Sequence, residues 1–101
     1  MKRIKIKPLL CAKTSLGAVC VKGWVKTRRD AKGFSFIEIN DGSCLANLQV
    51  IADAAMADYE KIKTLSTGSA ISVIGKMTPS PGKEQAWELQ AETSHIYNIA
   101  P

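Results

Sequence analysis

Two phenylalanines in residues 34–40 are the first candidates for chemistry in this chain. Alternate side chains of an extended strand point to opposite faces, so Ile37 and Ile39 share one face. Phe34 and Phe36 share the other face, and if the isoleucines enter a core, the phenylalanines face solvent. An exposed ring beside lysines and arginines can stack on a base of a single-stranded nucleic acid. The alternative for either phenylalanine is a structural role, in which the ring covers the end of the core and contacts no ligand.

An amide and a carboxylate extend this candidate surface. Gln49 lies opposite the apolar face of its strand, beside Phe36, and an amide offers both a donor and an acceptor for reading an unpaired base. Glu88 alternates with Leu89 and with Trp87, which we expect in the core. A carboxylate on an anion-binding face is unfavourable unless base amino or imino groups donate hydrogen bonds to it. A solvated strand residue is the alternative for both Gln49 and Glu88.

A basic run ends the first apolar segment. Arg28 and Arg29 suit phosphate contacts, or planar hydrogen bonding and stacking on a base, and Lys26 precedes them. The alternative is an intramolecular pair between an arginine and Asp30 that steadies the following turn. Trp24, in the same segment, is expected in the core.

Charge is distributed unevenly along the 101 residues. The chain has 14 basic and 9 acidic residues, for a formal net charge of +5. Residues 1–32 carry +9, whereas residues 33–101 carry −4. This distribution predicts one basic side and an anionic partner. A solvated lysine-rich tail is the alternative for residues 2–7, but the basic residues at 22–29 lie inside or just after a strand pattern.

The residue types argue against catalysis, metal binding and membrane insertion. Cys11, Cys20 and Cys44 have no paired spacing and His95 is the single histidine, a set that suits neither a zinc site nor a nucleophile and base. No glycine-rich phosphate loop, apolar run of 18 residues or leader pattern is present. We therefore expect a cytoplasmic binding protein with buried cysteines, no membrane partner and no cofactor of its own.

Five strands and one helix are predicted to position these residues. Gly23 is a natural bulge or bend in a long, curved first strand. Asp53 is a candidate N-cap, and apolar residues at helical spacing follow it until Gly68 ends the helix. A short helical turn is expected at residues 8–12. The strands are expected at 17–29, 34–40, 44–51, 69–77 and 85–92, with an extension of the last to 97 left open.

This order of elements defines a fold class. Three strands, a helix and two more strands make the OB-fold, an all-β five-stranded Greek-key barrel with its helix between strands three and four. We expect an N-terminal extension at residues 1–16, the barrel at 17–97 and a tail at 98–101.

Four motifs of the chain resemble a known family. They are residues 21–30, with Gly-Trp-Val and Arg-Arg-Asp, and residues 34–37, 40–43 and 48–51. Together they resemble the N-terminal anticodon-binding domain of the aspartyl, asparaginyl and lysyl group of class II aminoacyl-tRNA synthetases, over about residues 17–97. Within the group, Thr-Arg-Arg-Asp and the Asn-Asp-Gly-Ser turn are similar to bacterial-type asparaginyl enzymes. Aspartyl enzymes usually carry Arg-Arg-Arg-Asp and an Arg-Asp-Arg-Glu-Gly turn instead.

The resemblance implies a role for each candidate residue. Phe36 would stack on the central uracil of an anticodon, and Gln49 would hydrogen-bond it. Arg29 and Glu88 match positions near the first anticodon base, a guanine or its modified form, and two further basic residues would hold the backbone. The implied site residues are Phe36, Gln49, Arg29, Arg28, Glu88 and Lys26.

The chain departs from the family because it reaches Pro101 before any class II catalytic motif. The resemblance therefore implies a non-catalytic module that binds the tRNA anticodon loop. The parent enzyme would attach asparagine with ATP and magnesium, as a homodimer formed through its catalytic domain. A natural stand-alone paralogue is the alternative. The function could also be that of a general single-stranded nucleic-acid binder, an aspartyl-type domain or a protein-interaction barrel.

Overall fold

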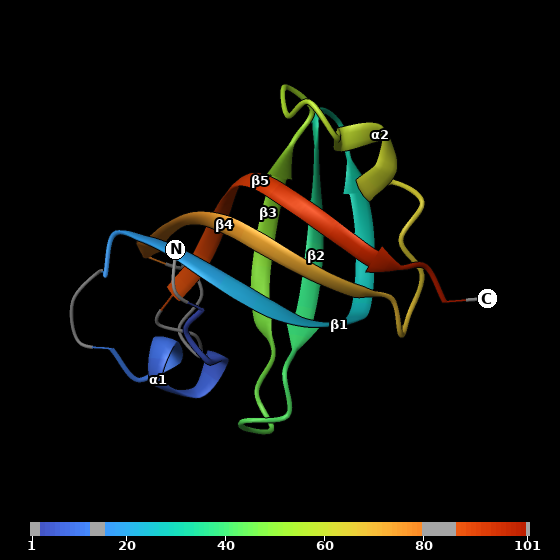
Figure 1. The fold of residues 1–101 in the computed structure, drawn as a ribbon. Coiled ribbons are helices and arrows are strands. Elements are labelled where there is room, and N and C mark those ends of the chain that lie inside the picture. Colours follow the sequence, from blue (N-terminus) through green and yellow to red (C-terminus); the bar gives the residue numbers. More distant parts are fainter. Residues whose placement is uncertain (1–2, 13–15, 80–86, 101) are drawn as a thin grey trace.

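A computed structural model describes residues 3–12, 16–79 and 87–100 (Figure 1). The residues 80–86, which include part of the loop expected before the last strand, lie outside the described residues. Within the described ranges the chain forms two short helices and five strands. They are α1 (Ile6–Leu10), β1 (Ala18–Ala31), β2 (Phe34–Asn40), β3 (Leu48–Asp53), α2 (Tyr59–Ile62), β4 (Ala70–Pro79) and β5 (Trp87–Asn98).

The strands close into a barrel in the order β1-β2-β3-β5-β4. The first half of β1 pairs with β4 and its second half pairs with β2, both antiparallel. The parallel pairing of Val50 with Leu89 and of Ile51 with Gln90 joins β3 to β5 and closes the barrel. This topology confirms the predicted five-stranded OB-fold.

The strand β1 changes partner near its middle. Gly23 stays in regular register with β4, so the bulge predicted there is wrong. A Cβ on Gly23 would lie 2.8 Å from the backbone oxygen of Asn40, which explains why this position needs glycine. The register shift falls between Val25 and Thr27 instead. Because one residue is inserted there, Lys26 and Thr27 are both exposed.

Two predicted element boundaries are wrong for local reasons. The strand β3 begins at Leu48 rather than at residue 44. The Asn40 amide donates to the carbonyls of Cys44 and Ala46, each at 3.1 Å, and this holds residues 44–47 in a loop.

The helix after β3 is also shorter than predicted, since α2 has only the four residues Tyr59–Ile62. Asp53 does not cap it, because the Asp53 Oδ1 accepts a hydrogen bond from the Ala55 N–H at 2.8 Å and starts a turn. The apolar spacing still indicates the core correctly, as Tyr59, Ile62 and Leu65 are buried.

The N-terminal residues pack on the barrel. The predicted helical turn at 8–12 is present as α1, and Ile6 and Leu9 are fully buried. The Ile4 N–H donates to the Cys20 carbonyl at 2.8 Å, and Arg3 forms a bridge with Cys20. A solvated tail is therefore the wrong interpretation for residues 3–7.

The core holds most of the expected residues. Ile37 and Ile39 are buried on β2, and Trp87 is buried on β5, as predicted. Trp24 contradicts its prediction, because 53% of its surface is exposed. The cysteine prediction is correct for Cys20 alone, since Cys11 is exposed and Cys44 is half-buried. No helix in the described ranges has the length and apolar character needed to cross a membrane.

Candidate nucleic-acid interface

The ring of Phe36 is half-buried on the outer face of β2 and stands between a cation and a second ring. Arg29 is its partner on β1, and the guanidinium carbon lies 4.8 Å from the centre of the Phe36 ring. Phe34 meets Phe36 edge to face, with ring centres 5.0 Å apart. Cation–π and edge-to-face contacts both hold an exposed aromatic ring in place. Phe36 is therefore a fixed platform with positive charge beside it.

A second polar pair lies where β3 meets β5. The Gln49 Nε2 donates to the Glu88 Oε2 at 2.6 Å. The pairing of Val50 with Leu89 brings these residues together, although 39 positions separate them in the chain. Glu88 is only 6% exposed, so a solvated strand residue is the wrong interpretation. Because a carboxylate accepts hydrogen bonds but donates none, it fixes the orientation of the Gln49 amide.

Phe36, Arg29 and Gln49 line one hollow of about 230 Å³ together with Thr27 and Glu38. Glu38 pairs with Gln49 across β2 and β3, and its Oε1 accepts a hydrogen bond from the Thr27 Oγ1 at 3.1 Å. The sequence interpretation missed Thr27 and Glu38 as lining residues. Strand alternation was the signal for Glu38, since it shares the outer face of β2 with Phe36.

Arg28 and Arg29 point to different surroundings. Arg28 faces away from the hollow, because its Nε donates to the Leu65 carbonyl at 2.8 Å and its guanidinium pairs with Asp30. The hydrogen bonds from Ser35 and Arg28 hold the pKa of Asp30 below its usual value. The intramolecular alternative for this arginine is thus observed, and Arg28 steadies the turn between β1 and β2.

Lys26 occupies the bulge of β1 and is exposed. It lines an adjoining hollow of about 510 Å³, whose other lining residues include Asn40, Leu45 and Asn47. The Asn47 amide reaches Glu38 of the first hollow at 3.5 Å. The two hollows are therefore neighbours on one surface.

The six predicted site residues fall into several groups. Arg29, Phe36 and Gln49 line the first hollow, and Glu88 lies behind the amide of Gln49. Lys26 lines the second hollow. Arg28 stabilises the turn between β1 and β2.

A larger hollow of about 610 Å³ lies between α2 and β5. Two acids, Asp58 and Glu60, line it together with the apolar residues Ile96 and Ile99. Lys61 and His95 also line it, but the two acids offset the charge of Lys61, so this hollow suits a nucleic acid less well than the first.

The barrel, with its aromatic, amide and basic residues on one outer face, defines a binding domain of the OB class. Residues 19–98 match the family described as "OB-fold nucleic acid binding domain", and the chain belongs to this family. The likeness to asparaginyl-tRNA synthetases that the motifs predict is confirmed by sequence relatives of that name.

Among its curated relatives are two bacterial proteins named asparagine–tRNA ligase. The chain is 50% identical over 100 residues to that of Nitratidesulfovibrio vulgaris, a match that covers 99% of this chain and 22% of the relative. It is 53% identical over 85 residues to that of Microcystis aeruginosa, a match that covers 83% of this chain and 19% of the relative. The chain thus spans about a fifth of the length of these relatives.

The solved asparaginyl-tRNA synthetase of Pyrococcus horikoshii shares the fold. The structures match with a TM-score of 0.82 at 18% sequence identity. The match covers 98% of this chain and 24% of that chain.

Proposed function

We propose that this chain is the anticodon-recognition module of an asparaginyl-tRNA synthetase and that it binds the anticodon loop of the asparagine tRNA. The observation that carries the proposal is the hollow lined by Phe36, Arg29 and Gln49, in which an aromatic platform adjoins an amide of fixed orientation. An unpaired base needs both features, a ring to stack on and a hydrogen-bonding group at its edge.

The orientation of Gln49 selects the base. Its Nε2 donates one of its two hydrogens to Glu88, and we propose that this turns its Oε1 toward the ligand as the hydrogen-bond acceptor. Uracil carries a donor at N3, whereas cytosine carries an acceptor there. A base stacked on Phe36 with N3 toward Gln49 is therefore favoured when it is uracil, the central base of the asparagine anticodon.

Basic residues around the hollow hold the phosphates. Arg29 contacts the Phe36 platform and Lys26 lies exposed on the adjoining hollow. Phosphate contacts of this kind bring affinity and a strong dependence on salt concentration. Arg28 acts as a positioning residue in this proposal, because its side chain is engaged by Asp30 and Leu65.

The remaining activity belongs to the longer proteins that the chain resembles. We propose that a parent enzyme attaches asparagine to its tRNA in the cytoplasm, with ATP and magnesium bound in a catalytic domain through which it dimerises. The module described here would select the tRNA and contribute no catalytic group. The support is the 50% identity to an asparagine–tRNA ligase over nearly the whole chain.

Two substitutions test the proposal. Stacking contributes about 1–3 kcal/mol per base, so Phe36→Ala should raise the Kd for an asparagine anticodon stem-loop by about fivefold to more than a hundredfold. Gln49→Ala should raise it by about tenfold, since it removes the base contact and leaves Glu88 without its partner. Fluorescence anisotropy with a labelled stem-loop measures both values.

Ile99→Ala is the control, because Ile99 is 50% exposed and lines the hollow between α2 and β5 instead. A stem-loop with a shuffled loop sequence and equal charge measures non-specific binding. Unchanged affinity in both variants would refute the site. Equal affinity for the cognate and shuffled loops would identify a general single-stranded nucleic-acid binder instead.

A further inference from the structure

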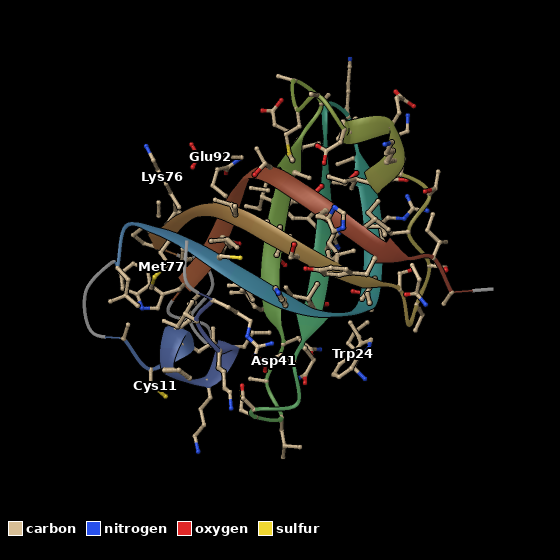
Figure 2. The ribbon with its side chains drawn as sticks, in the orientation of Figure 1. Cys11, Trp24, Asp41, Lys76, Met77 and Glu92 are labelled. Atoms are coloured by element: carbon tan, nitrogen blue, oxygen red, sulfur yellow. The ribbon has the colours of Figure 1, made fainter. Side chains whose placement is uncertain are left out.

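Two exposed aromatic residues lie outside the hollow assigned to the anticodon. Trp24 on β1 and Tyr97 on β5 are 53% and 52% exposed. They line one hollow of about 160 Å³ together with Arg3 and Lys22, and we call these four residues the Trp24 patch. Figure 2 shows the indole of Trp24 projecting outward from the barrel.

Neighbouring side chains hold the Tyr97 ring. The Lys22 Nζ lies 5.6 Å from its centre, and the His95 ring meets it edge to face with centres 4.7 Å apart. Hydrogen bonds of the Tyr97 hydroxyl with Ser72 and Lys22 hold the pKa of Tyr97 below its usual value. The ring is thus positioned by contacts, although half of it faces solvent.

The charge of the Trp24 patch suits an anion. Arg3 reaches it because residues 3 and 4 pair with Cys20. Asp41 is the one acid among the described residues that line the hollow, and its carboxylate accepts hydrogen bonds from the Ile6 N–H and from Ser43. The Asp41 carboxylate is thus engaged by α1 and its own turn, while Lys22 keeps its charge beside the Tyr97 ring at this hollow.

The Trp24 patch continues the surface that holds the anticodon hollow. Exposed side chains follow β1 from Lys22 through Trp24 and Lys26 to Arg29. At about 3.3 Å per residue this path is about 20 Å long, room for several nucleotides, and OB-folds bind roughly 4–16. Asn40 links the hollows, since it pairs with Trp24 across the strands and lines the hollow beside Lys26.

From these observations we propose that the Trp24 patch binds a nucleotide of the same RNA strand that flanks the anticodon, with the base stacked on Trp24 and its phosphates held by Lys22 and Arg3. The inference rests on the proposed function, since the strand must first be seated at Phe36. Aromatic rings beside cations, on the same strand as the anticodon hollow, favour RNA, because a single strand needs both stacking surfaces and counter-charge for its phosphates.

Two RNAs distinguish this patch from the anticodon hollow. The first is the anticodon triplet alone, a short strand without flanking nucleotides, and the second is the complete anticodon stem-loop. Trp24→Ala should raise the Kd for the stem-loop by about fivefold or more and leave the Kd for the short strand unchanged. Trp24→Phe should restore most of the affinity, because it keeps a ring. Phe36→Ala should raise the Kd for both RNAs.

Ile99→Ala is the matched control, since Ile99 is 50% exposed and lines a different hollow. As a second measurement, Lys22→Gln should reduce the slope of log Kd against log salt concentration by about one. Thermal unfolding verifies that each variant is folded.

The outcomes separate the two proposals. If Trp24→Ala binds the stem-loop as tightly as the unsubstituted chain does while Phe36→Ala binds it weakly, this inference is overturned and the anticodon site stands. If only Trp24→Ala weakens binding, the anticodon site at Phe36 is refuted, and this inference is overturned with it because the RNA is then not seated at Phe36.

Discussion

Replacing Glu88 with glutamine removes one negative charge and almost no volume from the seam between β3 and β5. Glu88 accepts a hydrogen bond from the Gln49 Nε2 at 2.6 Å and is 6% exposed. A glutamine at position 88 presents a donor as well as an acceptor. The Gln49 amide can then pair with residue 88 in either orientation. Its preference for the N3 donor of uracil over the N3 acceptor of cytosine should therefore weaken.

The size of the effect follows from the type of hydrogen bond. A bond to a charged group contributes about 1.5–3 kcal/mol and a neutral one about 0.5–1.5 kcal/mol. A flipped Gln49 amide loses its bond to a carboxylate but keeps one to a glutamine, so the orientation preference that Glu88→Gln removes is at least the difference of about 1–1.5 kcal/mol. Since 1.4 kcal/mol is a factor of ten, the preference for a uracil-centred over a cytosine-centred anticodon loop should fall about tenfold.

The assay is a pair of anisotropy titrations with stem-loops that differ only in the central base. Glu38→Gln is the matched control, because it also removes one carboxylate charge close to Gln49, whereas Glu38 accepts its hydrogen bonds from Thr27 and Asn47. It should change both affinities by a similar factor. A Glu88→Gln variant that keeps the full preference for uracil would refute the proposed role of the Glu88 carboxylate.

Two further predictions concern stability. Leu9→Ala should lower the free energy of unfolding by about 2–5 kcal/mol in urea titrations, because Leu9 is fully buried. The control Leu45→Ala changes an exposed residue and should lower it by no more than about 0.5 kcal/mol. An equally small loss for Leu9→Ala would show that α1 is dispensable for the core. Burial raises the pKa of Asp41, but hydrogen bonds from Ser43 and the Ile6 N–H outweigh it and hold that pKa below its usual 3.8. A carboxyl group whose pKa is lower in the folded than in the unfolded state stabilises the fold at pH values above its unfolded pKa, and this effect is lost as the pH falls through its folded pKa. The Tm of the unsubstituted chain should therefore drop below about pH 4, and the Tm of Asp41→Asn should drop less. Equal loss of Tm in acid for both proteins would contradict the prediction.

Strand alternation predicted the centre of the site because it is a local property. Ile37 enters the core and Phe36 faces outward, since consecutive strand residues must alternate. The same rule places Trp24 outward between the inward residues Val21 and Val25. The general tendency of tryptophan to be buried gave the wrong prediction there, although the local pattern contained the correct one.

Features that depend on distant residues could not be predicted. The burial of Glu88 requires β5 to lie against β3, and the engagement of Arg28 requires the Leu65 carbonyl from the segment after α2. The length of α2 is another example. A short helix forms only where tertiary packing supports it, and apolar spacing shows which side chains reach the core without showing how many turns are helical.

In the proposed function, the ability to read a base depends on the parallel pairing of β3 with β5, because this pairing closes the barrel. Gln49 and Glu88 come from the two sides of this seam and meet only when it closes. A chain with an open seam keeps Phe36 and Arg29 together on β1 and β2 but has an amide of undefined orientation. Specific binding of RNA therefore requires a closed barrel. By mass action, the bound RNA stabilises the closed barrel against opening.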